Sequence, residues 1–133
     1  MDSSVVVKWF LPEPSRNQAI RLLRNYQDGR IRLIAPALVM TEVASVFCKR
    51  ARRGELKESA VHHAYRLLKV CSPVLVADVE LLDDAVRLSI TSGQAVYDCL
   101  YLALAIHRGC EMVTADAKFH NAMAANFGTV LLQ

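Results

Sequence analysis

Short apolar runs rich in β-branched residues alternate along this chain with longer stretches of helical periodicity, and this alternation restricts the fold most. The short runs predict strands at residues 5–10, 32–35, 74–77, 112–114 and 129–132. The longer stretches predict helices at residues 15–27, 36–53, 56–70, 78–92, 96–107 and 116–126. Strands that alternate with helices are typical of an α/β domain with a mostly parallel sheet.

Individual residues support several of these helix ends. Ser15 can cap the helix that runs to Gln27, and Pro36 suits the first turn of the next helix. Gly54 and Gly93 are natural C-terminal stops. The composition, with 53% hydrophobic and 22% charged residues in 133, is that of one globular domain spanning residues 1–133. We see no signal peptide and no apolar run long enough to cross a membrane.

The four cysteines, Cys48, Cys71, Cys99 and Cys110, are widely spaced and form no CxxC pair. This spacing argues against a zinc knuckle or a thioredoxin-type site. Cys48 and Cys99 fall inside apolar helical patterns, where thiols usually act as small core residues. We expect all four to be reduced, which indicates a cytoplasmic protein.

Four acids stand at conspicuous places in the apolar chain: Asp2, Glu42, Asp98 and Asp116. Three of them lie where a strand-like or apolar run gives way to a helix, and Glu42 interrupts the apolar face of its helix. Acids at the ends of adjacent elements can meet, and a cation would relieve their repulsion. Mg²⁺ or Mn²⁺ prefers such oxygen ligands, so the set predicts a site for a hard divalent cation.

Each acid alone also has a structural explanation. Glu42 has apolar neighbours at helical spacing, so it could form a salt bridge to an arginine at the rim of the core. Asp98 could be a first-turn acid favoured by the helix dipole. Asp116 could cap its helix, and Asp2 could be a cap or a frayed terminus.

Basic residues indicate a polyanionic partner without requiring one, because the net charge is only +3. Lys8 and Lys118 lie close in sequence to Asp2 and Asp116, so they are candidates to bind substrate phosphate, although each could be a solvated charge. The sequence also holds one tight basic cluster, made of Lys49, Arg50, Arg52 and Arg53. The cluster could bind the phosphates of such a polyanion, or its cations could simply be favoured at a helix C-terminus.

The chain resembles PIN-domain ribonucleases, specifically the VapC type of bacterial and archaeal toxin. The matching segments are residues 2–10, Pro36 with residues 41–44, and residues 53–56, 96–105 and 114–116. They occur in family order and cover essentially the whole chain. The segment Tyr-Asp-x-x-Tyr-x-x-Leu-Ala with a downstream Thr-x-Asp is the most specific of them.

The resemblance implies a three-layer α/β/α fold with a mostly parallel central sheet. It implies a quartet of acids, Asp2, Glu42, Asp98 and Asp116, that binds Mg²⁺ or Mn²⁺ and hydrolyses RNA phosphodiesters. Ser4 and Thr114 occupy the accessory polar positions of the family, from which they would contact the metal-binding carboxylates or a water molecule at the site. It also implies a homodimer and a small VapB-like antitoxin partner that blocks the site.

The resemblance changes the expectation for the N-terminus. In this family residues 5–10 begin a helix, and the first strand ends at the aspartate. Only Met1 precedes Asp2 here, so either translation starts upstream or the domain has a shortened first strand.

Two other functions remain open at this point. A catalytically degenerate PIN domain could serve as a binding or assembly module. A phosphoacceptor receiver domain is also doubly wound with an acidic Mg²⁺ site, but it needs paired acids after the first strand, and Asp2 stands alone.

Overall fold

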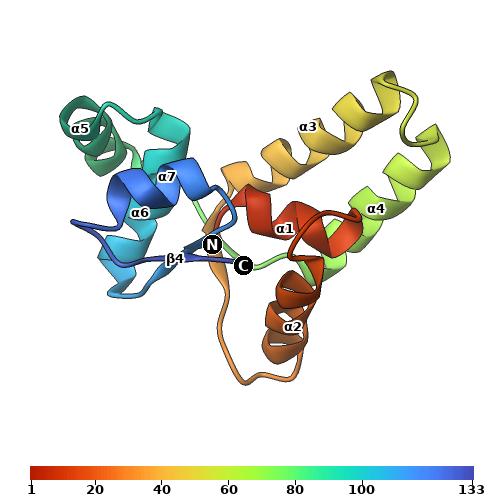
Figure 1. Cartoon of the computed structure of the whole chain (residues 1–133), viewed down its shortest axis with the longest axis horizontal. Coiled ribbons are helices and arrows are strands. Elements are labelled where there is room, and N and C mark those ends of the chain that lie inside the picture. The colour runs from red at the N-terminus through yellow and green to blue at the C-terminus, as the bar shows by residue number, and fades with distance from the viewer.

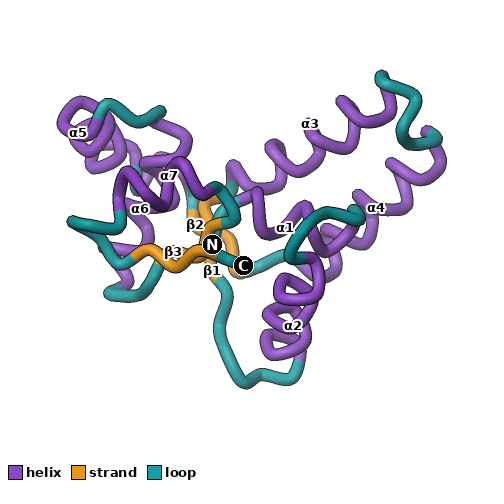
Figure 2. Tube along the Cα trace, in the orientation of Figure 1, coloured by secondary structure: helices purple, strands orange, loops and turns teal.

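Helices surround a small group of short strands in the computed structural model, which describes residues 1–133 (Figure 1). In the view of Figure 2 the strands lie in the middle, with α5 to α7 on one side and α1 to α4 on the other. This arrangement is the α/β fold that the sequence predicts. The elements are α1 (Ser3–Phe10), α2 (Arg16–Gln27), β1 (Ile34–Pro36), α3 (Leu38–Arg52), α4 (Glu58–Cys71), β2 (Val74–Val76), the 3₁₀ helix η1 (Asp78–Glu80), α5 (Leu82–Ser92), α6 (Val96–Arg108), β3 (Met112–Thr114), α7 (Ala117–Met123) and β4 (Thr129–Leu131).

The strands form two parallel pairs. Strand β1 pairs with β2, with Ile34 opposite Val74, and β3 pairs with β4, with Met112 opposite Thr129. The start of the chain lies between the two pairs: the Met1 amino group donates to the Ile34 carbonyl (3.3 Å), and the Asp2 amide donates to the Val113 carbonyl (3.1 Å). Figure 2 shows the N-terminus at this central position. No strand precedes Asp2, yet its backbone is fixed to β3.

Helix α1 contradicts the strand predicted from propensity at residues 5–10. The run from Val5 to Trp9 is buried on every side, so its β-branched residues pack as well in a helix as in a strand. Asp2 decides the local conformation because its side chain caps the helix by accepting a hydrogen bond from the Val5 amide (3.4 Å). The helix expected from the family resemblance is therefore the correct prediction.

Three other local predictions need correction. Pro36 is the last residue of β1, and α3 begins only at Leu38. Ser15 does stand at the N-cap of α2, but it lies in the left-handed region (φ 62°) and makes no side-chain cap bond. The predicted helix 78–92 divides into η1 and α5, whereas β3 has its predicted bounds.

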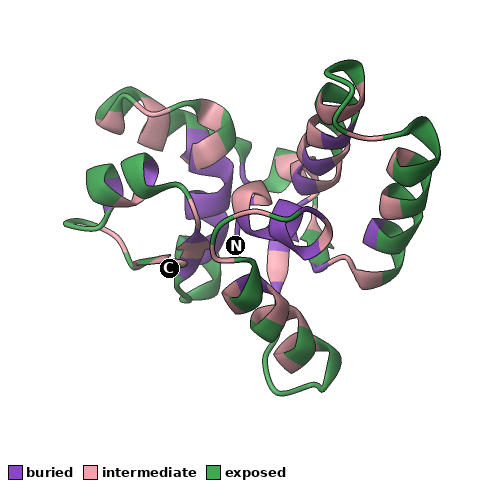
Figure 3. Ribbon diagram, turned by 45° about the vertical axis from the view of Figure 1, so that its right-hand side comes forward, coloured by how far each residue is buried: buried purple, intermediate pink, exposed green.

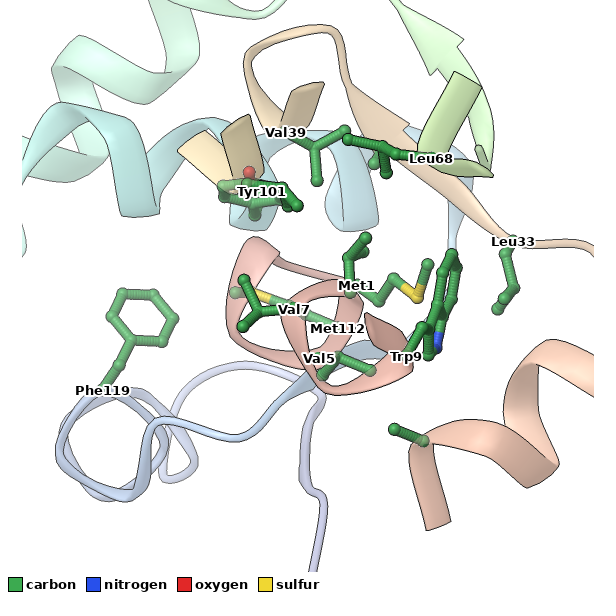
Figure 4. Packing of buried hydrophobic residues seen from close by; sticks show 14 of the residues in the cluster. Met1, Val5, Val7, Trp9, Leu33, Val39, Leu68, Tyr101, Met112 and Phe119 are labelled. Carbon is green, nitrogen blue, oxygen red and sulfur yellow. The ribbon is translucent and has the colours of Figure 1, made fainter. Parts of the chain in front are cut away.

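Two apolar clusters form the core. The larger contains 19 buried residues, which come mainly from helices α1, α2, α3, α4, α6 and α7 and from strands β1 and β3. Figure 3 shows the buried residues gathered on α1, the inner face of α3 and α6. Figure 4 shows residues of this cluster at close range, with Val5, Val7 and Trp9 of α1 among Met1, Val39 and Tyr101. The smaller cluster of six buried residues joins α5 to α6.

All four cysteines are free, as the sequence predicts. Cys99 is buried in the smaller cluster, whereas Cys48 is exposed, so its predicted place in the core is wrong. Cys48 lies on the face of α3 that points away from Val39, Val43 and Phe47, the buried residues of that helix. No helix in the chain is both long and apolar enough to span a bilayer.

Candidate active site

The four acids come from four different helices. Asp2 caps α1, Glu42 lies in α3, Asp98 lies in the first turn of α6, and Asp116 caps α7. Burial raises the pKa of the Asp98 carboxyl, and the negative charges of Glu42, Asp2 and Asp116 raise it further. The fold therefore brings all four carboxylates, separated widely in sequence, into one electrostatic environment.

Ser4 connects Asp2 to the segment that follows β3. Its hydroxyl donates to Asp2 Oδ1 (2.5 Å) and accepts from the Ala115 amide (2.8 Å). Burial raises the pKa of Asp2, and the hydrogen bonds from Ser4, Thr114 and the Val5 amide oppose this shift. Ser4 thus holds a buried carboxylate in place and fixes α1 relative to β3.

Asp116 and Thr114 shape the turn between β3 and α7. The Asp116 side chain accepts from the Phe119 amide (3.0 Å), which is the N-cap geometry that the sequence allowed. Thr114 is fully buried, and its hydroxyl accepts from the Asp116 amide (2.9 Å). One oxygen of the exposed Asp116 carboxylate is used by the cap, so the other is free to face a ligand.

Glu42 forms no ion pair with any arginine, so the salt-bridge interpretation is wrong. Its Oε2 instead accepts a hydrogen bond from the Tyr101 hydroxyl (2.5 Å). Sequence reasoning gave Tyr101 no role at the site. The available signal was its spacing, because Tyr101 follows Asp98 by three residues in α6 and residues so spaced share a helix face.

The donor set suits a hard divalent cation. The four acids supply only oxygen atoms, and none of them pairs with a lysine or arginine side chain that would neutralise its charge. As the side chains stand, however, no three histidine, cysteine or acidic residues form a group that could hold one metal ion. The carboxylates would have to converge when an ion binds.

A groove of about 630 Å³ is lined by one of the four acids, Asp116, and also by Ser4, Lys8 and Lys118. Lys118 is exposed, whereas Lys8 is only 8% exposed and pairs with Glu13 (3.4 Å). Both candidate phosphate-binding lysines therefore line the groove that contains Asp116. The Trp9 ring is buried in the core, which leaves it unavailable for stacking on a base.

The basic cluster at the end of α3 is only partly available to a ligand. Arg50 pairs with Glu13 (2.7 Å) and Glu55 (2.6 Å), and Arg53 lies 4.0 Å from Glu55. Lys49 and Arg52 are exposed and have no acidic partner. The cluster does not line the groove.

Comparison with known proteins gives two matches. The family model for the PIN domain matches residues 1–124. Ribonuclease VapC3 from Pyrobaculum aerophilum is 32% identical to the chain over an alignment of 125 residues, and the match covers 89% of this chain and 88% of that protein. The family-model match includes all four acids.

Proposed function

The chain belongs to the PIN domain family, and from this premise we propose that it is a divalent-cation-dependent ribonuclease that hydrolyses RNA phosphodiesters. The observation that carries the proposal is the environment of Asp98, whose pKa is raised by burial and further by three other acids that form no salt bridge. Carboxylates gathered without a countercharge are typical of sites for metal ions. The similarity to a protein named as a ribonuclease supports RNA as the substrate.

Asp2, Glu42, Asp98 and Asp116 would hold the Mg²⁺ or Mn²⁺ ion. When bound, the cation would supply charge neutralisation at the scissile phosphate and a water of lowered pKa. Asp98 or Asp116 would orient that water and accept its proton as a general base. Ser4 and Thr114 would keep Asp2 and Asp116 at fixed positions through the hydrogen bonds described above.

Lys8 and Lys118 would bind the RNA phosphates beside the scissile bond. Both lysines line the groove that contains Asp116. Glu13 neutralises Lys8 in the free protein at a distance of 3.4 Å. An RNA phosphate would compete with Glu13 for that ammonium group, and Lys118 offers a cation with no such competitor.

We propose the same context for the protein as for VapC toxins: a homodimer whose site is blocked by a small antitoxin, acting in the cytoplasm. Exposed apolar residues on and beside α5 support the dimer, since Val79 and Ile90 are 78% and 79% exposed. An antitoxin could insert an arginine among the acids and replace the charge of the cation. The four free cysteines support the cytoplasmic location.

The decisive experiment compares RNA cleavage by the native chain, Asp98→Asn and Asp83→Asn with Mg²⁺, with Mn²⁺ and with chelator. Asp83 is an exposed acid in the first turn of α5, so it gives the same chemical change away from the site. We expect cation-dependent cleavage by the native chain and Asp83→Asn, reduced at least 100-fold in Asp98→Asn, on the order of the loss for a missing catalytic group.

Other outcomes would point elsewhere. Equal cleavage by all three proteins would indicate a contaminating nuclease and remove the assignment of Asp98. If the native chain bound RNA but neither cleaved it nor bound Mn²⁺, the protein would be a PIN domain that acts as a binding module. RNA binding and Mn²⁺ binding are measured as well as cleavage, because the side chains as they stand include no group of three that could hold a metal ion.

A further inference from the structure

Tyr101 connects the helix that carries Asp98 to the side chain of Glu42. Its hydroxyl donates to Glu42 Oε2 (2.5 Å), although the two residues are separated by 59 positions in sequence. The Tyr101 ring is 3% exposed and belongs to the larger core cluster (Figure 4). The phenol is therefore fixed by packing, and its hydroxyl meets a carboxylate on a neighbouring helix.

The hydroxyl is a permanent donor. The hydroxyl donates to Glu42 Oε2, and a free tyrosine keeps its proton up to about pH 10. A tyrosine that keeps its proton can donate to a carboxylate but cannot add negative charge to the site. Tyr101 thus stabilises one of the four acids without neutralising it as a lysine or arginine would.

The contact also limits the conformations of Glu42. A glutamate on an otherwise apolar helix face has several rotamers and, in this structure, no ion pair to select one of them. The Tyr101 bond engages Oε2, whereas Oε1 has no hydrogen-bond partner. Because the Glu42 side chain is already restricted before a ligand binds, less side-chain entropy is lost on binding.

We propose that Tyr101 is a positioning residue, which holds Glu42 in the orientation from which the carboxylate joins Asp98 in binding the divalent cation. This inference rests on the proposed function, because it assigns Tyr101 a role in the same metal site. Partners that orient metal ligands typically contribute about 10–100-fold to metal affinity. Since the phenol acts through Glu42, its loss weakens cation binding more than it slows the reaction at saturating cation.

The experiment uses Tyr101→Phe, which removes the hydroxyl and keeps the ring that packs in the core. Tyr26→Phe is the matched control, because the Tyr26 hydroxyl also makes one tertiary hydrogen bond, to the Ser72 carbonyl (3.2 Å), away from the acids. Mn²⁺ affinity is measured by calorimetry on RNA-free protein, and the cation dependence of RNA cleavage is measured separately. Thermal melting shows that each variant is folded.

We expect Tyr101→Phe to bind Mn²⁺ about 10-fold more weakly and to recover most of the native cleavage rate when the cation is in excess. Tyr26→Phe should keep native affinity. In addition, Tyr101→Phe should have little further effect on affinity when Glu42→Gln is already present, because the two residues act as one unit.

Two results would overturn the inference in different ways. Native Mn²⁺ affinity in Tyr101→Phe, with a functional native enzyme, would show that the phenol only satisfies its own buried hydroxyl, and the ribonuclease proposal would stand. No Mn²⁺ binding and no cleavage by the native chain would remove the inference together with the proposed function.

Discussion

Asp98, a proposed ligand of the cation, is expected to lower the stability of the fold when no cation is bound. It is partly buried, and burial together with Glu42, Asp2 and Asp116 raises its pKa. A folded state that holds this proton more tightly than the unfolded chain gains stability as the pH falls through the raised pKa. Conversely, the charged carboxylate costs stability near neutral pH when no cation is bound.

We therefore predict that Asp98→Asn melts a few degrees higher than the native chain near pH 7 in chelator, since the amide removes the charge. The difference should shrink as the pH falls through the raised pKa and disappear below 3.8, the ordinary pKa, because the carboxyl is then protonated in both states. Circular dichroism melting at several pH values measures this. Asp83→Asn, at an exposed position outside the proposed site, should change little. A lower melting temperature for Asp98→Asn near neutrality would contradict the prediction.

At the scale of elements, helix α3 serves the proposed site at one place and ends in a basic cluster elsewhere. Glu42 faces α6, whereas the cations gather in the last turn, where the helix dipole favours them. Arg50 is held between Glu13 and Glu55, but Lys49 and Arg52 have no acidic partner. The two unpaired cations are therefore the part of the cluster that can bind RNA.

We predict that Arg52→Ala weakens binding of single-stranded RNA. The slope of log K against log salt concentration should become shallower by about 0.7, the value for one lost phosphate contact. The Asp98→Asn background prevents cleavage during the titration. Arg50→Ala should change the salt slope less, because its charge is already paired. Arg24→Ala on α2 provides a control for an exposed arginine outside the cluster. An unchanged slope in Arg52→Ala would assign the cluster a purely structural role.

Elements with a clear local signal were predictable from the sequence, whereas contacts between elements were not. The α/β class and the bounds of β3 followed from periodicity, and Gly93 ends α5 as expected. Residues 5–10 were wrongly predicted as a strand from propensity, because a run that is buried on all sides has no polar face to reveal its period. The Tyr101–Glu42 bond was invisible because it depends on how α3 and α6 pack.

At the scale of the whole molecule, the strands form two separate parallel pairs, β1 with β2 and β3 with β4. The start of the chain lies between β1 and β3. Met1 donates a hydrogen bond to β1, and Asp2 donates one to β3. Next to Met1 lies a cavity of about 270 Å³ whose lining is mostly apolar and includes Ile34, Tyr101 and Val113. Burial lowers the pKa of the Met1 amino group, so a charge is disfavoured at the centre of the fold.

This geometry predicts that joining an extended apolar segment to Met1 stabilises the domain. A Val-Ile-Val-Ile extension would replace the buried amine with an amide, pair with the free edges of β1 and β3, and fill apolar space. A Gly-Ser-Gly-Ser extension of the same length removes the charge but buries little. We expect a clearly higher melting temperature for the apolar extension than for the native chain or the polar control.

The pH dependence of this gain separates its causes. An amino group whose pKa is lowered by folding destabilises the native state below that pKa, and stability recovers as the pH rises toward 8.0, its ordinary value. The part of the gain that comes from removing the charge should therefore be larger near pH 6 than near pH 9 and equal in both extensions. The part that comes from strand pairing and burial should persist near pH 9 in the apolar extension alone. If both extensions melted alike at every pH, the space between β1 and β3 would not accept a strand, and the prediction would be wrong.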